Sequence, residues 1–311
     1  MRIDVILPTY NRADVLPRAI DSFLAATLPD HAETRLIVLD NNSTDTTPAI
    51  IQSYVDHHPD RIQSLFVEAQ GVRHALQAAT DRSTADVIAR FDDDEELQQD
   101  WLQVLARNFA DPTLDYLGGE MRPNWLVPRP AWLPTAYTGA VGIVHDGDQR
   151  RRYGSPGFSA MPVGGNCAIR RTALARCRPW TDSNLPYAED RFIYHELERI
   201  HAIGFYDPAL VVLHQIPQKR VTKRYRRFWA LSEGRIHALA AREAPSPARH
   251  FLRVPLWRWR RAASALAALA LHRGPPSARM DAELRLFEFW GYLTTAAGQG
   301  RDDLAYRTSL K

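Results

Sequence analysis

The sequence contains little cysteine: its 311 residues include only Cys167 and Cys177. Two cysteines without a metal-binding spacing exclude a disulfide-rich scaffold and a cysteine-ligated zinc module, and a reducing compartment is the default expectation. Long apolar runs are also missing. The longest, 262–271, is interrupted by Ser264 and is shorter than the about 20 residues that span a bilayer. The N-terminus shows no signal peptide pattern, so we expect a cytoplasmic protein, with peripheral contact at the inner face of the membrane left open.

A large excess of charge is absent as well. The 39 Lys and Arg residues nearly balance the 36 Asp and Glu residues, which gives a formal net charge of +3. Because the basic excess is only local, a nucleic-acid partner is not expected. Hydrophobic residues make up 45% of the chain and charged residues 24%, a composition typical of a globular protein with a full core.

The apolar pattern predicts an α/β fold. Four strand-like segments, at 3–7, 36–39, 65–67 and 87–91, are each followed by a segment with helical spacing or an acidic helix start. Strands that alternate with helices predict a mostly parallel twisted sheet flanked by helices, built from βαβ units. From residue 228 the pattern predicts helices to the end of the chain, so we expect a C-terminal helical extension.

The most informative stretch follows the fourth strand, where Asp92, Asp93 and Asp94 precede Glu95 and Glu96. Such a cluster of carboxylates is commonly kept for a cation, and hard oxygen ligands suit Mg²⁺ or Mn²⁺. The alternative is the acidic beginning of an amphipathic helix from Glu95, because acids stabilise helix N-termini. The stretch by itself supports both interpretations equally.

Further polar or flexible residues follow the other predicted strands: the loop 9–12, Asp40 and Gly71. Each has a structural explanation, as a helix cap or a turn. In a parallel sheet, however, ligands bind beyond the carboxyl ends of the strands. Four such loops at one edge predict a binding site there.

The second half of the chain adds candidates. Gly164 and Gly165 would let the backbone approach a ligand closely, although a turn or bulge explains them equally well. Asp190 falls in the first turn of a predicted helix, where the dipole favours its ionised form; it could act as a general base or only stabilise the helix. His214 ends a short predicted strand and could be a metal ligand or a core histidine.

Two basic segments follow. The run 219–227 could bind phosphate through its guanidinium groups or form a solvated helix face. The segment 251–271 combines Trp and Arg with an apolar face, which fits an interfacial membrane helix. It fits equally a helix packed on the main domain or on a second subunit, so membrane contact and a homodimer both stay open.

Six segments, in this order, resemble family 2 glycosyltransferases with the glycosyltransferase A-type fold. They are VILPTYNR at 5–12, VLDNNSTD at 38–45, FDDD at 91–94, GNCAIRR at 165–171, ED at 189–190 and the stretch 214–234. The resemblance covers about residues 3–237. It implies a division into a nucleotide-sugar-binding half at 1–120, an acceptor-binding and catalytic half of the same domain at 121–227, and a helical region at 228–311.

The resemblance also implies a function: metal-dependent, inverting transfer from a nucleoside-diphosphate sugar to a hydroxyl of a glycan, lipid-linked or small-molecule acceptor, in bacterial polysaccharide or glycoconjugate assembly. It makes Asp190 the catalytic base. The donor would contact Pro8, Thr9, Tyr10, Arg12, Asp40, Asn42, Gly71, Arg73, Asp92 and Asp93. The metal, Mg²⁺ or Mn²⁺, would bind Asp92, Asp94 and His214. The acceptor would contact Glu189, Gly165, Asn166 and Trp125, and phosphate would contact Lys219 and Arg220.

One departure from the family pattern concerns the donor loop, where Leu76 and Gln77 stand in place of a frequent Arg-Asn pair; Arg73 or His74 could substitute.

Two other functions compete with the glycosyltransferase interpretation. A sugar-1-phosphate nucleotidyltransferase would carry a glycine-rich phosphate loop after the first strand, and residues 8–12 contain no glycine. A catalytically silent glycosyltransferase-like assembly or membrane-docking module would be recognised by loss of nucleotide binding.

Overall fold

The computed structural model describes residues 1–134, 138–182, 189–243, 248–271 and 274–298. These residues form two compact units. Of these described residues, the first unit contains 1–123, 144–182 and 189–215, and the second contains 124–134, 138–143 and those from 216 onward. The division into 1–120, 121–227 and 228–311 stays a prediction.

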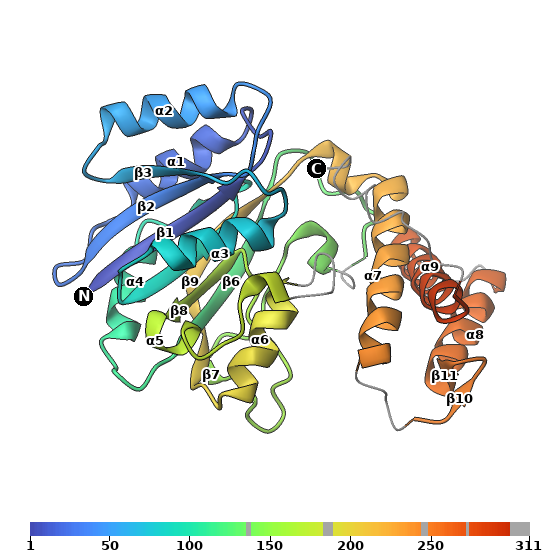
Figure 1. The fold of residues 1–311 in the computed structure, drawn as a ribbon. Coiled ribbons are helices and arrows are strands. Elements are labelled where there is room, and N and C mark those ends of the chain that lie inside the picture. Colours follow the sequence, from blue (N-terminus) through green and yellow to red (C-terminus); the bar gives the residue numbers. More distant parts are fainter. Residues whose placement is uncertain (135–137, 183–188, 244–247, 272–273, 299–311) are drawn as a thin grey trace. The chain divides into compact units, whose positions relative to one another are not determined.

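The first unit is built on one sheet with the strand order β3-β2-β1-β4-β8-β6-β9-β5, and β7 pairs with β9 (Figure 1). Its first four strands are parallel: β1 (Arg2–Thr9), β2 (Glu33–Asp40), β3 (Ile62–Phe66) and β4 (Val87–Phe91). The helices between them are α1 (Leu16–Ala25), α2 (Thr47–His57) and α3 (Val72–Arg82). The expected α/β sheet flanked by helices is confirmed.

The rest of the sheet is joined by antiparallel pairs. Its strands are β5 (Glu95–Leu97), β6 (Tyr116–Trp125), β7 (Arg151–Arg152), β8 (Asn166–Arg170) and β9 (Gly204–Ile216). The accompanying helical segments are α4 (Trp101–Phe109), α5 (Arg171–Leu174), η2 (Trp180–Asp182) and α6 (Glu189–Arg199).

Two local details differ from the sequence patterns. The alternative of a helix that begins at Glu95 is excluded, because Glu95 begins strand β5 and α4 starts only at Trp101. His214 does not end a short strand but lies inside the 13-residue strand β9, opposite Glu95. The pairing of β5 with β9 prevails over the acidic helix-start pattern, and it leaves Glu95 completely buried.

Apolar cores cover both faces of the sheet, as the alternation of side chains along a strand requires. On one face Ile3, Val5 and Leu7 of β1 pack with residues of α1, α2 and α4. On the other face Ile6 packs with residues of α3, α5 and α6. With both faces covered, the ends of the strands are the accessible part of the sheet.

The second unit contains η1 (Thr138–Val141), η3 (Gln218–Val221), α7 (Lys223–Glu243), α8 (Leu256–Ala270) and α9 (Pro276–Ala296). Helices α7 and α9 meet at Gly234 and Gly291, where a Cβ atom would overlap the backbone of the opposite helix. The expected C-terminal helices are present. The expectation of helix alone was wrong, because a hairpin of β10 (His250–Phe251) and β11 (Val254–Pro255) precedes α8. No helix among the described residues is long and apolar enough to cross a membrane.

Candidate active site

The carboxyl ends of β1, β2 and β4 meet at one edge of the sheet of the first unit. Thr9 is the register partner of Asp40 on β2, and Ile6 is the partner of Arg90 on β4. The acidic turn Asp92-Asp93-Asp94 therefore follows β4 beside the end of β1. The strand ends that carry the predicted loops therefore do lie at one edge, and the binding site expected there stays a prediction.

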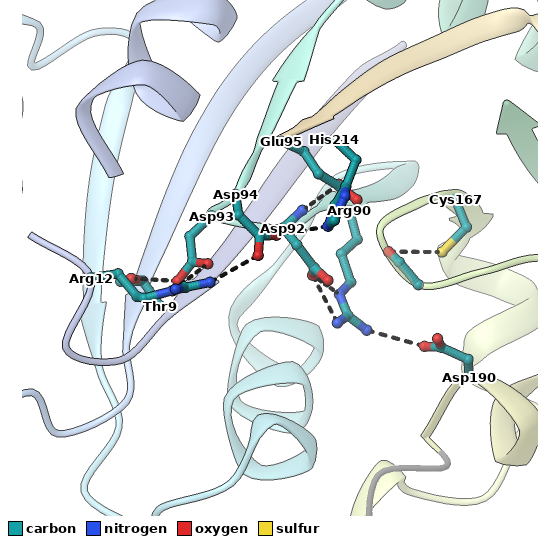
Figure 2. A network of polar contacts seen from close by, with 11 residues as sticks. Thr9, Arg12, Arg90, Asp92, Asp93, Asp94, Glu95, Cys167, Asp190 and His214 are labelled. Atoms are coloured by element: carbon teal, nitrogen blue, oxygen red, sulfur yellow. Dashed lines mark hydrogen bonds and ion pairs between the residues drawn. The ribbon is translucent and has the colours of Figure 1, made fainter. Parts of the chain in front are cut away.

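Arg12 ties the acidic turn to the first loop (Figure 2). Its Nε donates to Asp93 Oδ1 at 3.1 Å and its Nη2 donates to Asp94 Oδ2 at 2.8 Å. The Thr9 hydroxyl donates to the other Asp93 oxygen at 2.9 Å. Burial alone would lower the pKa of Arg12, but the carboxylates of Asp93 and Asp94 raise it above its ordinary value. Arg12 is therefore a permanent cation at the centre of this turn.

A second arginine, Arg90, joins the acidic turn to helix α6 (Figure 2). Its Nη2 donates to Asp92 Oδ1 at 2.9 Å, and its Nη1 lies 3.4 Å from Asp190 Oδ1. The Arg90 side chain is only 8% exposed, whereas that of Asp190 is 30% exposed. Asp190 thus combines a fixed position with access from solvent.

The environment of Asp190 sets its protonation. Burial raises the pKa of this carboxyl to about 6, against the opposing pull of the Arg90 cation, and Glu189 raises it further. At neutral pH most Asp190 side chains are ionised, yet they hold a proton more readily than an ordinary aspartate. Such a group can accept a proton from a hydroxyl near pH 7.

Asp94 and His214 form a nitrogen–oxygen pair suited to a divalent cation. His214 Nε2 lies 3.6 Å from Asp94 Oδ1, and the Gln215 amide donates to the Asp94 carbonyl at 2.8 Å, which fixes the two strands. Within the described residues no group of three or more His, Cys or carboxylate side chains could hold a metal. Mg²⁺ and Mn²⁺ commonly take one or two protein ligands and complete their shell with water and substrate phosphates. The pair fits that role. Asp92, the third predicted ligand, accepts hydrogen bonds from Arg90 at Oδ1, and its role at the metal stays a prediction.

Two glycines bring the chain before β8 against these carboxylates. A Cβ atom at Gly164 would overlap the Asp190 carboxyl and the Arg90 guanidinium, and one at Gly165 would overlap the Glu95 carboxyl. Glu95 is fully buried, and burial together with Asp92 and Asp94 raises its pKa well above the ordinary value. Close approach explains why glycine is required at both positions.

The second and third loops are cross-linked by amides. Asp40 Oδ1 accepts from the Ser43 amide at 2.9 Å, and Asn42 Nδ2 donates to the Glu68 carbonyl at 3.1 Å. The buried Asn41 donates to the carbonyl groups of residues 67 and 69 and accepts from the Gly71 amide at 2.7 Å. These bonds hold the predicted donor residues Asp40, Asn42 and Gly71 in one structure.

The remaining predicted residues differ in their placement. Asn166 is 1% exposed, and its amide bonds to Trp101 Nε1 and to two backbone carbonyls. Asn166 therefore joins β8 to its neighbouring elements, and its acceptor contact stays a prediction. The others stay predictions: Pro8 on β1, Tyr10 after it, Arg73 on α3 and Glu189 on α6 in the first unit, and Trp125, Lys219 and Arg220 in the second.

Three residues of this site were not predicted individually: Arg90, Glu95 and Asn41. Arg90 carried a usable signal, since a charged residue in the otherwise apolar run 87–91 needs a buried partner. Cys167 lies close by, but burial raises the pKa of its thiol to about 12. It is therefore protonated and unsuited to act as a nucleophile.

Comparison with known proteins places the chain in a family. The family description "Glycosyl transferase family 2" matches residues 4–178, more than half of the chain. The chain belongs to this family. The match ends before Asp190 and His214, so it does not itself test their roles.

The curated relatives match in part. An uncharacterized glycosyltransferase of Nostoc sp. is 34% identical over 118 residues, which are 38% of this chain and 35% of that protein. The succinoglycan biosynthesis protein ExoM of Rhizobium meliloti is 27% identical over 133 residues, 43% of each protein. A glucosyl-dolichyl phosphate glucuronosyltransferase of Haloferax volcanii is 25% identical over 164 residues, covering 50% of this chain and 51% of that protein. The chain thus spans about half the length of these relatives, or less.

Two solved structures share the fold. A mannosyltransferase of Pyrobaculum calidifontis in complex with GDP-Man and Mn²⁺ superimposes with a TM-score of 0.55 at 20% identity, covering 99% of this chain and 78% of that one. TarS residues 1–349 of S. aureus superimposes with a TM-score of 0.54 at 15% identity, covering 99% and 92%. The fold is that of the glycosyltransferase A-type enzymes.

Proposed function

We propose that this protein is a metal-dependent, inverting glycosyltransferase that moves a sugar from a nucleoside-diphosphate sugar to a hydroxyl acceptor in polysaccharide or glycoconjugate assembly. The observation that carries the proposal is the bridge made by Arg90. It fixes Asp190, a solvent-accessible carboxylate, relative to the acidic turn that follows β4. Inverting transfer needs a base and a site for the leaving diphosphate held at a set distance from each other.

Asp190 is the catalytic base in this proposal. It takes the proton as the acceptor O–H bond breaks. The acceptor oxygen forms the new bond to the anomeric carbon, and the bond from that carbon to the diphosphate oxygen breaks with its electron pair leaving on the diphosphate. General base catalysis of this kind contributes about 10²–10⁴ in rate. The N-terminal position of Asp190 on α6 favours its ionised form.

Asp94 and His214 would hold the divalent cation. When bound, a divalent cation stabilises the charge on the leaving diphosphate. The chain's own contribution is the fixed spacing of Asp94 and His214, which the pairing of Glu95 with His214 and the Gln215 bond to Asp94 maintain. Arg12 keeps the second oxygen of Asp94 in place.

Thr9, Asp40 and the cross-linked second and third loops would bind the nucleotide. The relatives fit this proposal: one is named for succinoglycan biosynthesis, and one solved neighbour holds GDP-Man with Mn²⁺. Experiment can identify the transferred sugar, the nucleobase of the donor and the acceptor.

The first experiment is thermal unfolding with UDP, GDP, dTDP or CMP, each with and without Mn²⁺. A ligand at a hundred times its Kd adds about 2.7 kcal/mol to the unfolding free energy. We expect one diphosphate to stabilise the protein, and only when Mn²⁺ is present. The variants Asp94→Asn and His214→Gln should lose that stabilisation.

His57→Gln is the matched control, because His57 is an exposed histidine on α2. It should keep the full response to nucleotide and Mn²⁺. A nucleotide response that ignores Mn²⁺ and survives both site substitutions would remove the metal from the proposal. No response to any nucleotide would favour the silent assembly module.

A further inference from the structure

The second unit contains a stretch in which all formal charge is of one sign. Residues 244–280 contain seven arginines and no lysine, aspartate or glutamate. The whole chain has a formal net charge of only +3, so the rest of the chain is net negative. This stretch includes the β10–β11 hairpin and helix α8. The positive charge of this stretch is therefore local.

The hairpin tip exposes apolar side chains. Phe251 is 56% exposed and Leu252 is 64% exposed, and Arg253 beside them is also exposed. The base of the hairpin is anchored: Val254 is fully buried, and Trp259 of α8 donates from Nε1 to the Phe251 carbonyl at 3.1 Å. The tip therefore projects from a fixed support.

The tip is also kept at a conformational cost. Leu252 and Arg253 form the two-residue turn with φ values of 49° and 62°. Such turns favour Asn and Gly, because larger side chains are strained when φ is positive. Strain that is retained at an exposed position indicates a use for the side chains themselves.

The first turns of α8 continue this surface. Leu256 is 36% exposed and Trp257 is 46% exposed. Arg260 is exposed and lies one helical turn after them, on the same side of the helix. We call Phe251, Leu252, Arg253, Leu256, Trp257 and Arg260 the hairpin surface.

Neighbouring acids are engaged elsewhere. The carboxylates of α9 pair as follows: Asp281 with Arg285, Glu283 with Arg227, and Glu288 with Arg258. Arg258 points inward and is buried, so it does not contribute to the hairpin surface. The exposed arginines of this surface are thus available to an outside anion.

We infer that the hairpin surface docks on a membrane that contains anionic phospholipid. Phe251, Leu252 and Trp257 would enter the interface between headgroups and acyl chains, where aromatic side chains are favoured. Arg253 and Arg260 would pair with lipid phosphates while their stems pass along apolar surface. A bilayer of this kind offers apolar depth and negative charge together.

A second copy of the chain fits this surface less well. A two-fold dimer would place the same patch against itself. The arginines of one copy would then face those of the other with no acid in the stretch to compensate, and like charges across an interface are costly. The inference does not depend on the transferase activity.

The test is flotation of the full-length chain with vesicles of phosphatidylcholine alone, or of phosphatidylcholine mixed with phosphatidylglycerol. We expect binding only to the anionic vesicles, with affinity that falls as salt is raised. Arg253→Gln and Arg260→Gln should each weaken binding roughly fivefold, since a juxtamembrane arginine contributes about 1 kcal/mol. The pair Leu252→Ser with Trp257→Ser should abolish binding at the same vesicle concentration.

The matched control is Phe66→Ser with Arg107→Gln, which removes an exposed aromatic residue and an exposed arginine from the first unit. It should bind like the parent chain. All variants alter exposed side chains, and circular dichroism checks that they fold. The inference is overturned if the parent does not float with anionic vesicles, if the hairpin variants float like the control, or if the Ser pair instead dissolves a dimer seen by ultracentrifugation.

Discussion

Arginines of the two units are placed in opposite surroundings. Arg12 and Arg90 in the first unit are buried, and each lies between two aspartates. Arg253 and Arg260 in the second unit are exposed, in a stretch of 37 residues without an acid. A buried arginine that pairs with two carboxylates holds them in fixed positions, because breaking either ion pair would leave a buried charge unpaired. An exposed arginine without an acid is available to bind an anion from outside.

The largest effect is expected at Asp190, the proposed base, which pairs with Arg90. Asp190→Asn removes the base but keeps the size and polarity of the side chain. We expect transfer activity to fall about 10²–10⁴-fold, with nucleotide binding nearly unchanged. Transfer assays and nucleotide titration on the same preparation measure both. Near-normal turnover would show that another group accepts the proton and that the Arg90–Asp190 ion pair has only a structural role.

Arg90→Met tests the ion pairs of Arg90 with Asp92 and Asp190 directly. We expect activity to fall about tenfold, because Asp190 loses the group that positions it. We also expect the free energy of unfolding to fall by about 2 kcal/mol, less than for a fully buried pair since both carboxylates keep contact with water. Denaturant unfolding and kcat measurements report the two effects separately.

The pH profile distinguishes positioning from simple loss of structure. The pKa of Asp190 is raised to about 6 by burial, while Arg90 opposes the rise. Activity needs the ionised form, so kcat/KM should fall as pH drops through about 6. Without Arg90 the pKa rises further, and this fall should move to higher pH. The control Arg35→Met breaks the Arg35–Asp4 ion pair in the same unit; it should lower stability without shifting the profile.

The sequence predicted the parallel part of the sheet because β1 to β4 each repeat the same local pattern of strand, loop and helix. It left two interpretations open at Glu95, which is buried in β5 opposite His214. Local preference allowed a helix start, and only the pairing of distant strands excluded it. The structural role of Asn166 was not predictable for a related reason: its partners come from other elements, Trp101 on α4 and carbonyls of residues 120 and 210.

For the candidate site, the sequence predicted which loops come together but not the contacts between distant residues. The loops at 9–12, 40–42 and 92–94 were expected at one edge, because strand order in a parallel sheet brings them together. The pairing of Arg90 with Asp190 was not predictable, since it joins residues 100 positions apart. The hairpin at 250–255 was missed because its turn, Leu252-Arg253, lacks the usual Asn or Gly.

That same turn supplies the smallest and most selective test of the comparison. Replacing Leu252 with Asn and Arg253 with Gly (Leu252→Asn, Arg253→Gly) gives residues that accept a positive φ. We expect the free energy of unfolding to rise by about 1 kcal/mol as strain is relieved, while binding to anionic vesicles weakens. Denaturant unfolding and vesicle flotation measure the two changes. Trp257→Ser is the control, because it removes an exposed side chain without altering the turn; it should weaken binding with no gain in stability. A loss of stability in the turn variant would mean that the side chains of the tip support the fold. The contrast between the buried, paired arginines of the first unit and the exposed hairpin surface would then not hold.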